Sequence, residues 1–70
     1  MRLIEITREP VELYKVLKFE GLVGSGAEAK SAVAEGLVLV NGVVETRKRK
    51  KLVSGDIIEF GGEQLQLQLI

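Results

Sequence analysis

The sequence predicts an α+β fold in which two helices pack on a small, mostly antiparallel β-sheet. Three observations indicate this architecture. A short β-type opening at Leu3 to Ile6 is followed by apolar residues at helical spacing. After Gly36 the pattern changes to short β-branched runs that are divided by glycine-containing turns. The last run, Gln64 to Leu69, alternates glutamine with leucine at the period of two that a half-buried strand requires.

The length and composition predict a single domain that covers residues 1–70. Hydrophobic residues make up 46% of the chain and charged residues 29%, which excludes a disordered chain. The absence of cysteine excludes a disulfide framework and fits a reducing compartment. No apolar run approaches the ~20 residues that cross a membrane, and the charged first residues do not match a secretion signal. We therefore expect a cytoplasmic protein without a membrane partner.

The first helix is predicted from Val11 to Glu20, with Pro10 in its first turn and Gly21 after its end. Its apolar arc consists of Leu13, Tyr14, Val16 and Leu17. Lys15 and Lys18 share the other, exposed side of this helix. Lys18 lies nearer the loop between the helices, so we include it among the candidate ligand contacts.

The second helix is predicted from Gly26 to about Glu35. Ser25 followed three residues later by Glu28 matches a capping box, and Gly36 is the glycine expected after the last turn. The face expected to pack inward consists of Ala29, Ala32, Val33 and Gly36. Lys30 lies on the flank of that face and is a candidate contact for a phosphate.

The first predicted hairpin joins Leu37–Val40 to Val43–Glu45 through Asn41-Gly42. This dipeptide is the strongest short-range hairpin signal, because both positions of the turn need a positive φ. A second turn at Ser54-Gly55-Asp56 precedes a strand at Ile57–Phe60.

The last predicted hairpin turns at Gly61-Gly62 and continues into the glutamine–leucine strand. We expect its three leucines to face the core and its glutamines to face water. These leucines are Leu65, Leu67 and Leu69.

Charge is concentrated at one structured place, immediately after the first predicted hairpin. Ten basic and ten acidic residues cancel over the whole chain, but five cations are consecutive, and without them 5 positive and 10 negative charges leave a net −5. These cations are Arg47, Lys48, Arg49, Lys50 and Lys51. A neutral protein with such a polarised charge presents one side to a polyanion, and we predict that this polyanion is RNA. The other interpretation is a solvated loop, or charges that keep a sheet edge from pairing with another chain.

The three aromatic residues do not indicate a surface for single-stranded nucleic acid. Tyr14, Phe19 and Phe60 each lie in an apolar pattern and are expected in the core. Modules that bind single strands usually expose aromatic rings for base stacking. The pattern therefore favours recognition of folded RNA through its backbone and shape.

Catalysis finds little support in the sequence. The chain contains no histidine and no cysteine, so the commonest general bases, nucleophiles and metal ligands are absent. The glycine-rich stretch from Gly21 to Gly26 lacks the Gly-Lys-Ser/Thr of a phosphate-binding loop. We predict that the protein is not an enzyme, and we expect no metal, no cofactor and no small-molecule substrate.

Several of these motifs occur together in one known family. The chain resembles the S-four domain, a small RNA-binding module, over about Val11 to Phe60. The resemblance rests on the order helix, glycine, V-N-G hairpin and G-D turn, and its residues are Leu17, Phe19, Gly21, Ser25, Ala29-Lys30, Gly36 to Gly42 and Gly55-Asp56. The chain is most similar to the short bacterial YbcJ-like members, which share E-G-x-x-x-S-G-A-x-A-K and V-E-T-R-K-R.

The resemblance implies a module that grips structured RNA, such as ribosomal or transfer RNA, within a larger ribonucleoprotein assembly. Many members of the family have Ser-Arg at the start of the second helix, whereas this chain has Gly26 after Ser25. Lys30 matches the family's later basic position. The five cations after the hairpin would therefore supply more of the attraction to RNA.

Other function classes are considered beside RNA binding. A ubiquitin-like interaction protein also shows V-N-G and G-D-x-I, but here Gly61-Gly62 is followed by eight further residues. A helix-turn-helix DNA binder would have to read bases with the second helix, which carries mostly alanine. A third alternative is a protein–protein contact in which Gln64–Leu69 is an edge strand added to a partner's sheet.

Overall fold

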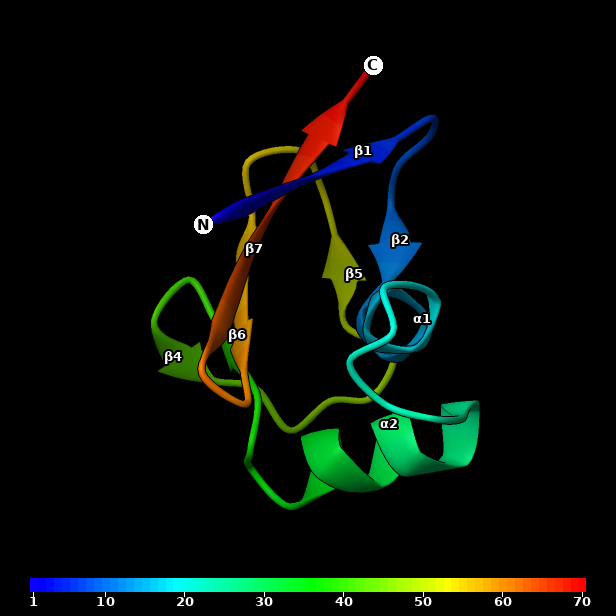
Figure 1. Cartoon of the computed structure of the whole chain (residues 1–70), viewed down its shortest axis with the longest axis vertical. Helices are drawn as coiled ribbons and strands as arrows, with labels where there is room; N and C mark the ends of the chain where they lie inside the picture. The colour runs from blue at the N-terminus through cyan, green and yellow to red at the C-terminus, as the bar shows by residue number, and fades with distance from the viewer.

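The computed structural model describes all 70 residues and contains two helices and seven strands (Figure 1). The helices are α1 (Leu13–Phe19) and α2 (Gly26–Ala34). The strands are β1 (Arg2–Ile6), β2 (Val11–Glu12), β3 (Leu39–Val40), β4 (Val43–Val44), β5 (Lys51–Leu52), β6 (Ile57–Phe60) and β7 (Glu63–Leu69).

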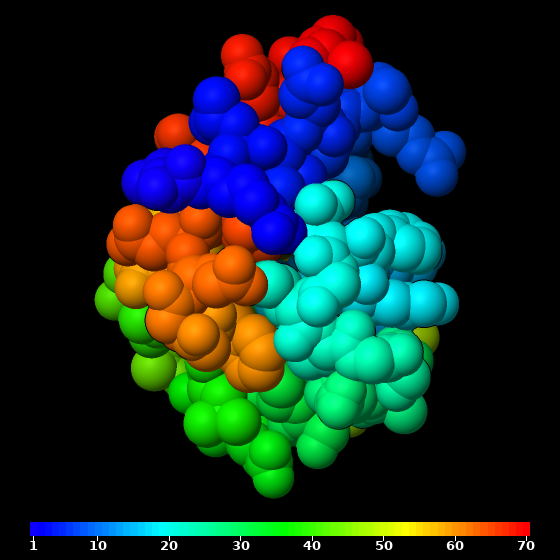
Figure 2. Space-filling model, viewed as in Figure 1, coloured from blue at the N-terminus to red at the C-terminus, as the bar shows by residue number.

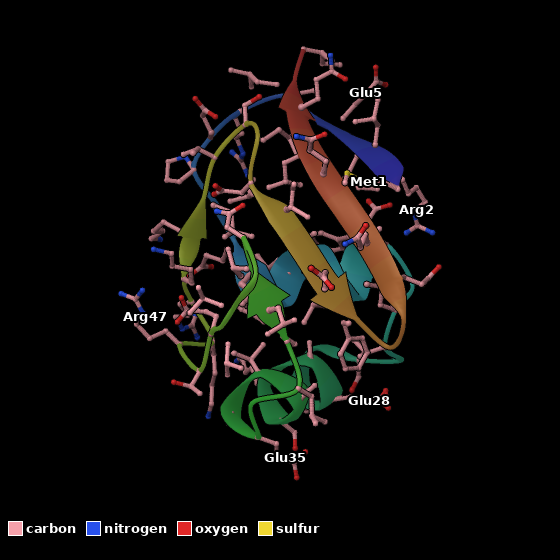
Figure 3. The ribbon with its side chains drawn as sticks, turned by 90° about the vertical axis from the view of Figure 1, so that its left-hand side faces the viewer. Met1, Arg2, Glu5, Glu28, Glu35 and Arg47 are labelled. Atoms are coloured by element: carbon pink, nitrogen blue, oxygen red, sulfur yellow. The ribbon has the colours of Figure 1, made fainter.

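The strands form one five-stranded sheet in the order β1-β7-β6-β3-β4 and a separate two-stranded sheet of β2 and β5. All neighbours are antiparallel except β1 and β7. The two helices lie on one side of the five-stranded sheet, and Figure 3 views that sheet from its other face. The predicted α+β class, with two helices on a mostly antiparallel sheet, is confirmed.

The parallel pair of β1 and β7 joins the two ends of the chain. Its register places Ile4 beside Leu67, and both side chains are buried. The amide of Ile70 continues this contact by donating to the Ile6 carbonyl at 3.0 Å. The sequence indicated both strands but not their pairing. Two parallel strands need a long connection between them, and here all the other elements lie in that connection. A local sequence pattern therefore cannot predict that β1 pairs with β7.

Helix α1 begins later than predicted. Val11 and Glu12 are not helical but pair antiparallel with Leu52 and Lys51, so Pro10 precedes a strand rather than standing in the first turn of a helix. The helix thus has seven residues. Cross-strand pairing with a segment far along the chain here overrides the local preference for helix.

Helix α2 has the predicted caps at both ends. The Ser25 hydroxyl accepts from the Glu28 amide at 3.1 Å, while the Glu28 carboxylate accepts from the Gly24 amide at 2.6 Å. The carboxylate thus reaches one residue further back than in a standard capping box. At the other end Gly36 has a φ of +77°, and its amide donates to the Val33 carbonyl at 3.0 Å. This left-handed glycine ends α2 as predicted.

The hairpin of β3 and β4 is tied to the turn before β6. Asn41 and Gly42 both have a positive φ, as a two-residue turn of this kind requires. The Asn41 side chain donates to the Asp56 carboxylate at 3.1 Å and accepts from the Ile57 amide at 2.9 Å. The same carboxylate accepts from the Val53 amide at 2.9 Å. Both side chains are structural, as predicted. Their hydrogen bonds hold the chain in place on both sides of residues 45–52.

Thirteen buried residues form one core between the helices and the sheet. They are Ile4, Leu13, Val16, Leu17, Ala29, Ala32, Val33, Val38, Val40, Leu52, Ile58, Leu65 and Leu67. The inward faces predicted for both helices are confirmed by this set, apart from Tyr14 and Gly36, which are only partly buried.

Two predicted core residues are exposed instead. Phe19 is 71% exposed, because at about 100° per residue it lies about 240° around α1 from Leu13, away from the buried arc. Leu69 is 42% exposed, because it lies beyond the part of β7 that pairs with β6 and has only the end of β1 beside it. Both expectations were wrong because the apolar pattern in the sequence extends beyond the residues that the neighbouring elements cover.

Alternate leucines of β7 provide a direct test of this core. Leu67→Ala should lower the free energy of unfolding by about 2–5 kcal/mol, since it leaves a cavity among fully buried side chains. Leu69→Ala should lower it by less than about 1 kcal/mol. Urea unfolding followed by circular dichroism measures both values. Equal losses for the two variants would contradict the core described here.

Candidate nucleic-acid interface

The basic segment, residues 47–51, is docked by its backbone on the first turn of α1. The first amides of a helix have no partner within the helix, and the residue before α1, Glu12, provides no side-chain cap. Instead the Leu13 amide donates to the Lys50 carbonyl at 3.0 Å and the Tyr14 amide to the Lys48 carbonyl at 3.2 Å. The backbone that carries the five cations is therefore held against α1.

The basic segment is a loop that contains a turn, as the run of cations after the hairpin suggests, except that its last residue, Lys51, lies in a strand. The Lys50 amide donates to the Arg47 carbonyl at 3.2 Å, which closes a turn over Lys48 and Arg49. Lys51 already belongs to β5 and pairs with Glu12 of β2. The strand at Lys51 and the late start of α1 have the same cause, because both belong to the β2–β5 pair.

Tyr14 brings together cations from separate elements. The Lys30 ammonium of α2 lies 4.7 Å from the centroid of the Tyr14 ring, and the Arg49 guanidinium of the basic segment lies 5.2 Å from it. Arg49 also donates to the Tyr14 hydroxyl at 3.4 Å. Cations at these distances are attracted to the ring. Lys30 and Arg49 therefore share one face of the molecule.

Lys18 lies at the border of the same face. A Cβ built at Gly26 would be 3.9 Å from the Lys18 Cδ and 3.9 Å from the Tyr14 Cε2, so both side chains lie beside the start of α2. The Lys18 ammonium itself lies 5.5 Å from the centroid of the Phe19 ring. We use the name basic face for Tyr14, Lys18, Lys30 and Arg49.

Arg47 is engaged with a carboxylate of its own. Its Nε and Nη2 donate to the two oxygens of Glu45 at 2.9 and 3.1 Å, and its amide donates to the same carboxylate at 3.0 Å. The side-chain hydrogen bonds from Arg47, followed by the backbone one, lower the pKa of Glu45 to about 2. In turn the pKa of Arg47 is raised. This bidentate pair fastens the end of the first hairpin to the basic segment, at the edge where Figure 3 shows Arg47.

Glu12 is surrounded by three cations. Its carboxylate lies 3.2 Å from the Lys15 ammonium, 3.5 Å from the Arg49 guanidinium and 3.7 Å from the Lys51 ammonium. The hydrogen bond from Lys15 is the largest cause that lowers the pKa of Glu12, and desolvation opposes it. Lys48 and Lys50 have no carboxylate partner within ion-pair distance. These two lysines are thus the segment's uncompensated charges.

The charge pattern in the sequence identified the cations but not the tyrosine that organises them. We expected Tyr14 in the core, and its ring is only half-buried between α1, α2 and the basic segment. A signal was present, because Tyr14 lies at the edge of the apolar arc and its hydroxyl needs a polar partner.

The structure contains no group of three or more acidic side chains placed to hold a metal ion. Neither helix is long and apolar enough to cross a membrane.

Comparison with known proteins identifies the class to which this fold belongs. The model of the S4 domain, called the S-four domain above, matches residues 4–68. The chain belongs to the S4 domain family, and the resemblance seen in the sequence is confirmed.

Among its relatives are two bacterial proteins and one solved structure. The chain is 54% identical over 57 residues to the "Putative RNA-binding protein YbcJ" of Escherichia coli, covering 81% of each chain. It is 37% identical over 59 residues to the "Probable ribosome maturation protein RlbA" of Bacillus subtilis, covering 84% of this chain and 83% of that one. The solution structure of Escherichia coli YbcJ matches with a TM-score of 0.74 and 48% identity, covering 97% of this chain and 87% of that one. That structure is described as revealing an ALFAL motif involved in RNA binding.

The Glu45–Arg47 pair predicts a pH dependence of stability. The pKa of Glu45 is about 2 in the folded protein against an ordinary value of 4.5. The pair therefore stabilises the fold above about pH 4.5, and this contribution is lost as the pH falls toward 2. Relative to Glu45→Gln, the native chain should be more stable near neutral pH and lose that advantage over this range. Urea unfolding of both proteins across the range measures the difference, and a difference that stays constant to pH 2 would contradict the assignment.

Proposed function

We propose that this chain is a non-catalytic RNA-binding protein that holds structured RNA against the basic face and the adjoining basic segment. The observation that carries the proposal is the position of Tyr14. Its ring gathers a lysine from α2 and an arginine from the basic segment, although the two are 19 positions apart in the sequence. Membership of the S4 domain family and the names of the relatives support the same function.

Phosphate groups are the part of RNA that this arrangement fits. Lys48 and Lys50 have no carboxylate partner, and Lys18 and Lys30 contact only rings and side-chain stems. Each phosphate contact would contribute about 0.7–0.9 to the slope of log affinity against log salt. Four to five contacts give a slope of about −3 to −4.5, and a specific target must add contacts to its shape or bases.

Two carboxylates restrain the attraction of the basic segment for any polyanion. Glu45 holds Arg47, and Glu12 lies within ion-pair distance of Arg49 and Lys51. A phosphate must compete with these carboxylates for the same donors. The affinity that comes from charge alone is therefore weakened. An RNA whose backbone follows the basic face binds more tightly than an RNA of arbitrary shape.

Ribosomal RNA is the first target class to test. The Bacillus subtilis relative is named as a ribosome maturation protein, and we propose that this chain likewise binds a structured RNA of a ribonucleoprotein assembly. Transfer RNA is the second class, because it presents the same kind of folded backbone.

A protein–protein role receives less support from the arrangement of the strands. The glutamine–leucine strand β7 has a neighbour on each side, β1 and β6, so it is not the free edge that strand addition needs. The Gly61-Gly62 pair forms the turn between β6 and β7 and is not a free terminus of the ubiquitin-like kind.

Removing one cation of the basic face tests the proposal. Arg49→Ala should weaken binding to a ribosomal RNA hairpin about fivefold to tenfold near physiological salt, since a hydrogen bond to a charged group is lost. It should also reduce the salt slope by about 0.7–0.9. Fluorescence anisotropy with labelled RNA over a salt series gives both quantities.

The matched control is Arg2→Ala, which also removes one arginine. Arg2 lies on β1 and contacts the end of α1 through Glu20, and Figure 3 shows it at the opposite edge of the view from Arg47. Its removal should leave the affinity nearly unchanged. Equal losses for both variants, with circular dichroism unchanged, would mean that only net charge matters and would refute the assigned site.

A further inference from the structure

A groove separates β1 from α1 on the side of the helix that faces away from α2. Its volume is about 550 Å³. The apolar part of its lining consists of Ile4, Ile6, Pro10, Val11, Val16 and Phe19. Figure 2 shows the surface of α1 in cyan below β1 and the following turn in blue, with an indentation between them at the right of the view. The contact of Lys18 with Phe19 and the ion pair of Arg49 with Glu12 reach the rim of this groove, but the basic face does not otherwise use its apolar lining.

Phe19 is the only aromatic residue of the groove lining, and its ring is 71% exposed. A single exposed apolar side chain by itself needs no explanation. Here, however, the Lys18 ammonium lies over the ring, 5.5 Å from its centroid, so a cation adjoins an exposed aromatic side chain. An aromatic face with a cation beside it is the combination that binds a nucleobase together with its phosphate.

Two lysines make this ring continuous with the basic face. The stem of Lys18 lies beside Tyr14 at the start of α2, while its ammonium reaches Phe19. Lys15 lines the groove, and its ammonium lies 6.0 Å from the centroid of the Tyr14 ring. An RNA strand that extends from the basic face across the exposed side of α1 therefore passes the ammonium groups of these two lysines before it reaches the Phe19 ring.

We infer that the groove binds one unpaired nucleobase of the same RNA, stacked on Phe19, with its phosphate beside Lys18 and Lys15. This inference rests on the proposed function and refines it, because the target then carries an unpaired nucleotide next to its folded part. The volume is within the range of about 300–1,000 Å³ that small-molecule sites show.

The carboxylates of the groove do not oppose this ligand strongly. Glu20 is paired with Arg2, and Glu12 has Arg49 and Lys51 within ion-pair distance as well as Lys15, so Glu12 stays paired when Lys15 contacts a phosphate. Glu5 has no ion-pair partner, and a carboxylate at this position can accept a hydrogen bond from the amino group of a base. A peptide strand is the alternative occupant, but the two lysines that lead from the basic face favour a nucleic acid.

Phe19→Trp turns the ring into a reporter, because the chain has no other tryptophan. Two RNAs are compared: a ribosomal RNA hairpin with a short single-stranded extension and the same hairpin without it. The extended hairpin should quench the tryptophan emission through stacking, and the blunt hairpin should leave it nearly unchanged. Replacing the bases of the extension with abasic nucleotides should abolish the quenching.

Phe19→Leu is the matched variant for affinity, since it keeps an apolar side chain but removes the aromatic face. It should bind the blunt hairpin as the native chain does and lose about tenfold on the extended hairpin. Phe19→Tyr should bind both RNAs like the native chain. Because Phe19 is exposed, none of these changes should disturb the fold.

The inference is overturned if Phe19→Leu binds the extended hairpin as tightly as the native chain does, or if the abasic extension quenches equally. Should that happen while Arg49→Ala still weakens binding to both hairpins, the nucleobase site fails and the proposed function stands. If the native chain binds neither hairpin, both fail together.

Discussion

The capping of α1 by the basic segment is the constraint on which the rest of the site depends. A helix of seven residues is too short to be stable alone, and its first amides need partners that its own N-cap residue does not provide. The carbonyls of Lys48 and Lys50 supply them. The cations therefore cannot move away without leaving amides of α1 unsatisfied. The backbone of the basic segment is thus already ordered in the folded protein. A polyanion that binds it does not have to pay the entropy cost of ordering this backbone.

Tyr14 and two carboxylates then hold the cations. Tyr14 collects Lys30 and Arg49 on one face, Glu45 engages Arg47, and Glu12 engages both Arg49 and Lys51 beside that face. A chain with no net charge can carry such a surface because its acids lie mostly elsewhere. Under the proposed function, this arrangement would favour a ligand whose phosphates match the positions of these cations over one that is attracted by charge alone.

The features that sequence reasoning predicted correctly are local ones. The turn at Asn41-Gly42 and both caps of α2 depend on residues within a few positions of each other, and all are present. The parallel β1–β7 pair and the β2–β5 pair depend on partners far along the chain, so neither was predicted, and the start of α1 was misplaced with them. For the site, the run of cations was evident from charge. The exposure of Phe19 follows from its angular position on α1 relative to Leu13. The contacts of Tyr14 with Lys30 and Arg49 depend on how α1 packs against α2 and the basic segment, which no local pattern contains.

The most direct test of the account is a map of the amides that respond to RNA. Two-dimensional NMR of the labelled chain, titrated with a ribosomal RNA hairpin, reports every residue at once. We expect the largest shift changes at Tyr14, Lys30 and residues 47–51. The amides of the β6–β7 hairpin should hardly move. Large changes centred on that hairpin, with the basic segment unaffected, would contradict the account.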